Sequence, residues 1–179
     1  MPRIEIRSAV PADLPILVAF DHSYQTSHVW QMDITSTEGQ SDIHFRETRL
    51  PRLVTMTYPR SPAVLLEDWM KRSALLVGIV DGLPVSYISL SEGVAVSTSW
   101  VTDLVVNKPY RRQKIGTTLL MAAEDWAKNR GNTRVLVEMQ SKNTPAIHMA
   151  LQLGYQFCGY NDHYYANQDI AIFFAQYLR

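Results

Sequence analysis

A strand-to-helix junction in the second half of the chain carries the clearest chemical signal. The apolar run 104–106 leads into a basic loop with Arg111, Arg112 and Lys114, and an amphipathic helical pattern starts at Gly116. The first N–H groups of a helix lack intrahelical acceptors, and together with the helix dipole they attract phosphate. Gly116 also lets the backbone come close to an anion. The junction therefore predicts a phosphate-binding loop, although a solvated basic turn before a helix has the same composition.

The elements that must position this loop follow from the periodicity of the apolar residues. Asp81 and Gly82 tolerate positive φ and separate two apolar runs, which is typical of a β-hairpin. Gly131 and Gly154 each follow a segment of helical period, as expected where a helix ends. We expect strands at 4–7, 74–80, 84–90, 97–106, 134–139, 155–158 and 170–174, an extended stretch at 45–56, and helices at 11–18, 63–72, 116–130 and 145–153.

This order predicts one α+β domain, residues 1–179, with a mixed, mostly antiparallel central sheet flanked by helices. The segment 23–41 is polar and is expected to be irregular. We find no repeats, low-complexity tracts or domain linkers in the sequence.

The composition of the chain limits which partners and which cellular compartment are expected. Lys+Arg and Asp+Glu number 17 each, so the zero net charge gives no electrostatic footprint for nucleic acid or an anionic membrane. No stretch approaches the roughly 20 apolar residues that span a bilayer, and residues 1–10 do not form a signal peptide. A cytoplasmic location is expected. Cys158, the single cysteine, is expected in the core, and no His/Cys spacing predicts a metal site.

The run from Tyr110 to Gly116 resembles the coenzyme A loop of the GNAT N-acetyltransferase superfamily. The family pattern is Gln or Arg, two residues, Gly, one residue, then Gly or Ala. Arg111 and Gly116 fit its two ends, whereas Lys114 stands where the pattern has Gly; a side chain is tolerated there if φ stays negative. A second match follows at the expected distance, with Asn143-Thr144-Pro145-Ala146 leading to Leu153-Gly154-Tyr155.

The resemblance covers the chain from about Leu75 onward, and its details look similar to streptothricin-type acetyltransferases. Those details are Trp126-Ala127-Lys128, the strand end Glu138-Met139-Gln140, and the tail segments 165–168 and 177–179. The resemblance implies a GNAT-like domain in which two strands splay apart to admit acetyl-coenzyme A. The cofactor-binding residues that it implies are Leu104, Val105, Val106, Arg111, Arg112, Gln113, Lys114, Ile115, Gly116, Thr117 and Asn143.

The resemblance also implies that an amine attacks the thioester directly, so that no Ser or Cys nucleophile is needed. A backbone N–H near Leu104 then polarises the thioester carbonyl. The amine must lose a proton, and the candidate bases are Asp103 and Glu138. Relatives often carry two consecutive acids where this chain has Thr102-Asp103, and these two side chains face opposite ways unless a bulge intervenes. Either carboxylate is equally compatible with a structural role.

The residues expected to donate a proton and to bind the acceptor are less well defined. The family's tyrosine, four residues before the glycine of the second motif, is replaced by Ala150, and Tyr165 is chosen as a substitute from the tyrosines nearby. An aromatic, acidic pocket for a cationic amine is expected from Trp30, Asp33 and Trp100, with Trp69 as a further candidate; core packing is the alternative for each Trp.

The function expected from the sequence is N-acetylation of a small-molecule primary amine. Acetylation of a protein N-terminus or lysine is a second interpretation, and a non-catalytic acyl-CoA-binding sensor is a third, because Lys114 and Ala150 depart from the family pattern. We expect acetyl-CoA as the cofactor, a small-molecule amine as the substrate, and neither nucleic acid nor a membrane as a partner. A homodimer is compatible with the sequence.

Overall fold

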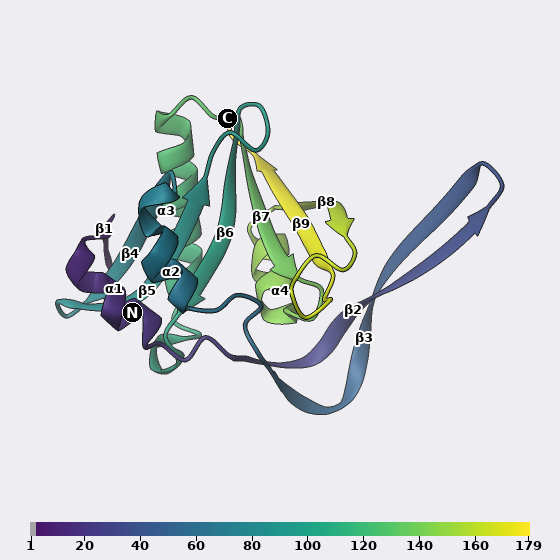
Figure 1. Ribbon diagram of the computed structural model, residues 1–179, viewed down its shortest axis with the longest axis horizontal. Coiled ribbons are helices and arrows are strands. Elements are labelled where there is room, and N and C mark those ends of the chain that lie inside the picture. The colour runs from purple at the N-terminus through teal and green to yellow at the C-terminus, as the bar shows by residue number, and fades with distance from the viewer. Residues whose placement is uncertain (1–2) are drawn as a thin grey trace.

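The computed structural model describes residues 3–179, which form one sheet with helices on both faces and a long two-stranded arm (Figure 1). The sheet has seven strands in the order β1-β4-β5-β6-β7-β9-β8. Their bounds are β1 Glu5–Ser8, β4 Ala74–Val80, β5 Leu83–Ser91, β6 Thr98–Val106, β7 Arg134–Gln140, β8 Gln156–Asn161 and β9 Ala171–Tyr177. β6 and β7 are parallel and the other neighbours are antiparallel, which confirms the mixed, mostly antiparallel sheet.

Helices cover both faces because the central strands are apolar on both sides. On one face lie α1 (Leu14–Val18), which follows a short turn of 3-10 helix, and α2 (Ala63–Asp68). On the other lie α3 (Ile115–Asn129) and α4 (Thr144–Gln152). Alternate residues of β4 divide between the two layers: Val77 packs toward α1 and α2, and Leu76 toward α3. A strand buried on both faces reads as a continuous apolar run, which is why its position could be predicted.

The parallel pair at the centre of the sheet separates part-way along its length. β6 and β7 are paired only from Thr98 and Arg134 to Val101 and Val137. Beyond these positions β6 stays paired with β5, and β7 stays paired with β9. The strands therefore diverge like a V toward their carboxyl ends, as Figure 1 shows, and this confirms the splayed strands expected from the sequence.

The segment expected to be irregular is instead a β-strand. β2 (Tyr24–Thr37) pairs with β3 (Gln40–Met56) in a separate two-stranded sheet that forms the arm. The expectation was wrong because Ser and Thr dilute the alternation of Trp30, Met32 and Ile34. The turn at Glu38-Gly39 that closes the hairpin was also not identified from the sequence. Gly39 has a φ of 78° in this turn, a conformation that glycine adopts easily.

Two further observations concern single features of the sequence. Cys158 is exposed on β8, not in the core as expected, because β8 is an edge strand and one side of it stays open. None of the helices formed by residues 3–179 has both the length and the apolar composition needed to cross a membrane.

Candidate functional site

The backbone of β6 directs polar groups into the gap that β7 leaves. Asn107 donates its N–H to the carbonyl oxygen of Val85 on β5, at 2.9 Å. In an antiparallel pair, the backbone groups of alternate residues face the same neighbour, so those of Val105 also face β5. The N–H and C=O groups of Leu104 therefore point away from β5, into the V. They lie beyond the last residue of β6 that pairs with β7, which is Val101.

Two arginines donate hydrogen bonds to the carbonyl oxygens of Thr102 and Val106, which lie two residues before and two residues after Leu104. Arg60 Nη1 donates to the Thr102 carbonyl at 2.8 Å, and Arg111 Nε donates to the Val106 carbonyl at 2.7 Å. Arg111 also donates to the Ser23 carbonyl at 2.6 Å. This arrangement fixes the two ends of the open edge and leaves the peptide groups of Leu104 to face the cleft.

The basic loop ends in an uncapped helix start. Lys114 is the N-cap of α3, and it makes no side-chain capping hydrogen bond. The first helical bond within the loop runs from Thr118 N–H to the Lys114 carbonyl, at 3.0 Å. In residues 3–179, no acceptor faces the N–H groups of Ile115, Gly116 and Thr117. These three N–H groups form the anion-binding corner that the sequence predicts.

The condition set for Lys114 is not met, because its φ is +63° and not negative. Arg112 also has a φ of +63°. Left-handed backbone costs a residue with a side chain about 1 kcal/mol or more, so the loop holds two strained positions next to the helix start. Arg112 and Lys114 therefore adopt a backbone conformation that glycine favours, although neither residue is glycine.

Packing also favours glycine at position 116. A Cβ at this position would lie 3.2 Å from Met149 Sδ and 3.4 Å from Leu104 Cδ2. The missing side chain therefore lets α3 approach α4 and β6 closely. Asn143 holds the start of α4, where its Oδ1 accepts from the Ala146 N–H at 3.3 Å.

Two adjoining cavities lie along the V. The outer cavity, of about 460 Å³, contacts the loop and helix start predicted from the sequence. Its walls include Leu104, Val105, Val106, Arg111, Arg112, Lys114, Gly116, Thr117 and Asn143. The inner cavity, of about 50 Å³, shares Leu104, Asn143 and Tyr58 with it and reaches Glu138 and Tyr165. Gln113 and Ile115 are not on either wall: Gln113 donates to the Pro109 carbonyl and Ile115 is core.

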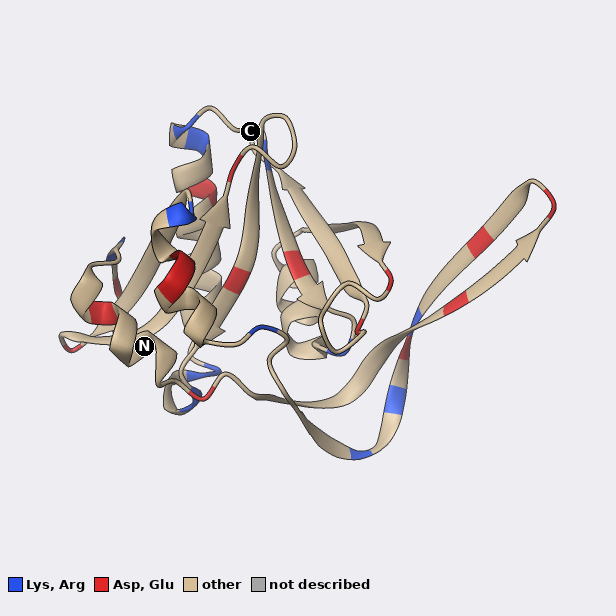
Figure 2. Ribbon diagram, in the orientation of Figure 1, with Lys and Arg blue, Asp and Glu red and all other residues tan. Residues whose placement is uncertain are grey.

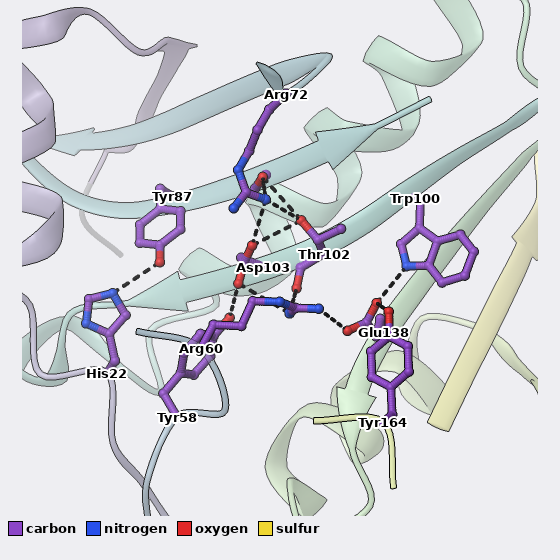
Figure 3. Close-up of polar contacts among 11 residues, drawn as sticks. His22, Tyr58, Arg60, Arg72, Tyr87, Trp100, Thr102, Asp103, Glu138 and Tyr164 are labelled. Carbon is purple, nitrogen blue, oxygen red and sulfur yellow. Dashed lines mark hydrogen bonds and ion pairs between the residues drawn. The ribbon is translucent and has the colours of Figure 1, made fainter. Parts of the chain in front are cut away.

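A bulge in β6 places Asp103 in a dense polar cluster (Figure 3). Ser89 pairs with Asp103 and Leu90 pairs with Val101, so Thr102 is the extra residue. Thr102 Oγ1 donates to Asp103 Oδ2 at 3.0 Å, so the bulge brings these two side chains together. The buried carboxylate also accepts from Arg72 Nη1, at 3.0 Å, and from the Tyr58 hydroxyl, at 2.7 Å.

Glu138 occupies the facing position on β7. Its buried carboxylate accepts from Trp100 Nε1 and from the Tyr164 hydroxyl, both at 3.0 Å (Figure 3). The Arg60 guanidinium pairs with Glu138 and lies 3.5 Å from Asp103 Oδ1. It also lies 5.4 Å from the centre of the Tyr165 ring. One cation, held by two acids and an aromatic face, thus bridges the two strands at the narrow end of the V, just beyond their last paired residues.

The comparisons agree with this geometry. A sequence profile described as the acetyltransferase (GNAT) family matches residues 42–155. The chain belongs to the acetyltransferase (GNAT) family. It is similar to the streptothricin acetyltransferase of Streptomyces lavendulae, with 28% identity over 161 residues that cover 87% of this chain and 82% of the relative.

Solved structures of GNAT proteins share the fold. Nourseothricin acetyltransferase has a TM-score of 0.82 at 23% identity, with 98% of this chain and 99% of the other covered. A Bacillus anthracis protein described as a streptothricin acetyltransferase, in complex with acetyl coenzyme A, has a TM-score of 0.77 at 17% identity, with the same coverage. The ribosomal-protein-S18-alanine N-acetyltransferase of Escherichia coli has a TM-score of 0.68 at 17% identity, covering 98% and 94%.

GNAT acetyltransferases use acetyl-CoA, and the cleft fits that cofactor. The uncapped helix start can hold a diphosphate, and the open β6 edge can pair with an amide-bearing chain. When bound, acetyl-CoA supplies the acetyl thioester. The GNAT fold and the acetyl-CoA cofactor predicted from the sequence are therefore confirmed.

The inner cavity of this GNAT domain has tyrosines in unusual places. Ala150, at the position of the family's tyrosine, is buried and forms part of the cavity wall. Tyr58 and Tyr165 reach the same cavity from other segments. Burial raises the pKa of both hydroxyls above the ordinary value for tyrosine, so both stay protonated at neutral pH.

Only part of the expected acceptor pocket lies together. Trp100 contacts Glu138, as described above, but Trp30 lies outside both cavities and packs against Phe45 and Phe174. Asp33 lies out on the arm, where it forms a 3.2 Å ion pair with Arg46. Sequence reasoning missed Tyr58, Arg60 and Arg72, which complete the cluster, and it considered Tyr164 but preferred Tyr165. Their spacing carries no signal, because only the fold brings these segments to β6 and β7.

Proposed function

We propose that this GNAT protein transfers the acetyl group of acetyl-CoA to a primary amine of a small, cationic molecule. The observation that carries this proposal is the Arg60 guanidinium, which lies between the carboxylates of Asp103 and Glu138. A site that holds one cation with two buried acids and aromatic rings has the chemistry to hold a protonated amine. The similarity to a streptothricin acetyltransferase supports the same substrate class.

The cofactor is bound by backbone more than by side chains in this proposal. The N–H groups of Ile115, Gly116 and Thr117 bind the diphosphate, and Arg112 and Lys114 add charge from the cleft wall. Arg111 acts indirectly, because its guanidinium is already committed to carbonyl oxygens of the chain. The Leu104 N–H faces the thioester carbonyl and polarises it.

Glu138 and Tyr165 carry the proton transfers in this proposal, and Asp103 positions their neighbours. The Glu138 carboxylate binds the acceptor ammonium in place of Arg60 and accepts its proton. Tyr165 Oη, kept protonated by burial, holds a proton at the inner cavity for the leaving sulfur. Asp103 binds Tyr58 and Arg72 and keeps both oriented toward the site. Trp100 holds Glu138 in place through its indole N–H.

The test is thiol release from acetyl-CoA with a panel of acceptors. We expect small molecules that carry several ammonium groups, streptothricin included, to give a kcat/KM at least tenfold above that of peptides with free N-termini or lysines. A preference for peptides would favour the protein acetyltransferase. Tight cofactor binding with no turnover on any acceptor would favour the sensor. The predicted cytoplasmic location and the predicted absence of nucleic-acid and membrane partners stay predictions.

A further inference from the structure

The loop 162–170, which joins β8 to β9, brings Tyr165 to the inner cavity (Figure 1). Between residues 162 and 169 the side chains are exposed except at Tyr165 and Asp169, which are buried. His163 and Gln168 have left-handed backbone, with φ of 52° and 66°, a conformation that persists only where the surrounding contacts enforce it. The loop therefore needs anchors, and its two buried side chains are the candidates.

The backbone of Asp169 closes the turn that holds Tyr165. The Asp169 carbonyl oxygen accepts from the N–H groups of Tyr164, at 3.2 Å, and Tyr165, at 3.3 Å. The Tyr165 carbonyl oxygen in turn accepts from the Gln168 N–H at 2.8 Å. Both backbone polar groups of Tyr165 are thus bonded inside this turn. The position of Asp169 therefore sets the position from which the Tyr165 ring enters the cavity.

The Asp169 side chain fastens the turn to β7. The loop carries two acids, Asp162 and Asp169, and no Lys or Arg (Figure 2). The compensating cation comes from Lys142, just after β7, which pairs with Asp169 Oδ1. Asp169 Oδ2 accepts from Gln140 Nε2 at 2.7 Å and from Asn167 Nδ2 at 2.9 Å. Both oxygens of this buried carboxylate are therefore engaged, and two of the three donors come from the end of β7.

The amide of Gln140 has one orientation that satisfies both of its neighbours. An ionised carboxylate only accepts, so the Gln140 NH₂ group must face Asp169 and its Oε1 must face the other way. On that side the Tyr24 hydroxyl donates to Oε1 at 2.8 Å. Tyr24 and Gln140 are both buried. A buried chain of hydrogen bonds therefore runs from the start of the arm, across the end of β7, to the loop that holds Tyr165.

We propose that Asp169 is a positioning residue for acetyl transfer, which acts by holding Tyr165 Oη at the inner cavity. This inference rests on the proposed function, in which Tyr165 holds the proton for the leaving sulfur. Asp169 lies on the wall of neither the inner nor the outer cavity, so its effect on the reaction passes through the loop. Its removal should therefore change the rate of turnover more than the binding of the cofactor.

The test is a double-mutant cycle on kcat for acetyl transfer to a cationic amine. Asp169→Asn keeps the size of the side chain but sets an amide NH₂ group against the donors Gln140 and Lys142. We expect kcat to fall about tenfold, with KM for acetyl-CoA changed less than about threefold. In the Tyr165→Phe background the same substitution should lower kcat by less than about threefold, because the hydroxyl that it positions is already gone. A merely structural role would cost the same factor in both backgrounds.

The matched control is Asp162→Asn, at the other end of the same loop. The exposed Asp162 carboxylate accepts from the His163 N–H at 2.9 Å and does not contact β7, so we expect kcat to be unchanged. Asn167→Ala is a second variant that removes one bond to Asp169 and leaves its contacts with Gln140 and Lys142 in place. It should lower kcat less than Asp169→Asn, with the same dependence on Tyr165, and it keeps the test open if Asp169→Asn does not fold.

The outcomes separate this inference from the proposed function. Equal factors in the two backgrounds, or full activity of both Asp169→Asn and Asn167→Ala, overturn the positioning role and leave the proposed function standing. An unmodified chain without turnover on any amine overturns the proposed function and this inference with it. A full kcat in Tyr165→Phe removes the proton donor that Asp169 is proposed to position, and so overturns the inference at that residue.

Discussion

At the scale of single residues, the proposed acceptor site balances buried charges of opposite sign. Two arginines face two carboxylates, and Arg60 is the more exposed of the two, with 26% of its side chain exposed against 13% for Arg72. Removing one member of a buried ion pair leaves the other without compensation, at a cost of about 3–5 kcal/mol. An incoming ammonium that replaces Arg60 avoids this cost, because it restores the positive charge at the same place. In the proposed function, this exchange favours cationic acceptors, because an ammonium restores the positive charge that the site would lack once Arg60 has moved away.

The variant Glu138→Gln tests this at the acceptor end. The amide keeps the size of the side chain and can still accept from Trp100 and Tyr164, but it neither attracts an ammonium nor accepts its proton. We expect kcat/KM for a cationic acceptor to fall about 100-fold, with KM for acetyl-CoA changed less than threefold. Steady-state thiol release measures both. Glu67→Gln, on the exposed face of α2, is the control and should change neither value. Equal losses for cationic and neutral amines would contradict the binding of the ammonium by Glu138, and an unchanged kcat would contradict its role as the base.

The candidate residues show how far sequence reasoning reaches at this scale. Asp103 and Glu138 could be predicted because each interrupts an apolar strand, and a buried acid stands out in such a run. Arg60 could not be predicted as a site residue, because it lies in a polar segment where an arginine is common. Trp30 looked unusual in a polar context, yet it anchors the arm to Phe174, which no local pattern indicated.

At the scale of elements, the cofactor loop has the conformation expected for the family, but it has Lys114 where the family pattern has Gly. The strand, the loop and α3 follow the sequence prediction closely, because apolar periodicity and the helix start fix them. The conformation of Lys114 could not be predicted, because a positive φ in a residue with a side chain is set by the surrounding loop. Of the arm, only the extended stretch 45–56 was predicted; the rest was missed because its strands bury little of their surface, so their alternation is weak.

Lys114→Gly tests the strain in this loop. Glycine removes the left-handed penalty but adds freedom to the unfolded chain, so we expect a net gain of up to about 1 kcal/mol in the free energy of unfolding. Lys114→Ala removes the same charge and keeps a Cβ in the left-handed region, so it should give no such gain. Coenzyme A affinity, measured by calorimetry, should fall by a similar few-fold in both variants, because both lose the ammonium near the diphosphate. If alanine stabilises as much as glycine, the strain is not at Lys114.

At the scale of the whole molecule, stability and pH are linked through groups far from one another. His22 lies between α1 and the arm, where its Nδ1 donates to the Phe20 carbonyl at 2.8 Å and its Nε2 accepts from the Tyr87 hydroxyl at 3.1 Å. Burial lowers the pKa of His22 below the ordinary value for histidine. On β1, the Arg7 guanidinium lowers the pKa of the Asp13 carboxyl through a 2.7 Å ion pair. The neutral His22 links three parts of the fold: α1, the arm and β5.

Both shifts have the same sign in their effect on folding. The unfolded chain binds a proton at His22 more readily than the folded chain, so stability from this residue is complete above pH of about 6.5 and is lost as the pH falls toward the lowered pKa. The Asp13 contribution is complete above pH of about 4 and is lost only below it. We therefore expect the free energy of unfolding, measured in urea between pH 8 and pH 3, to fall in two steps on acidification. His22→Gln keeps a polar side chain near Tyr87 but cannot titrate, so it should flatten the first step and leave the second. A first step that persists unchanged in this variant would assign it to another group.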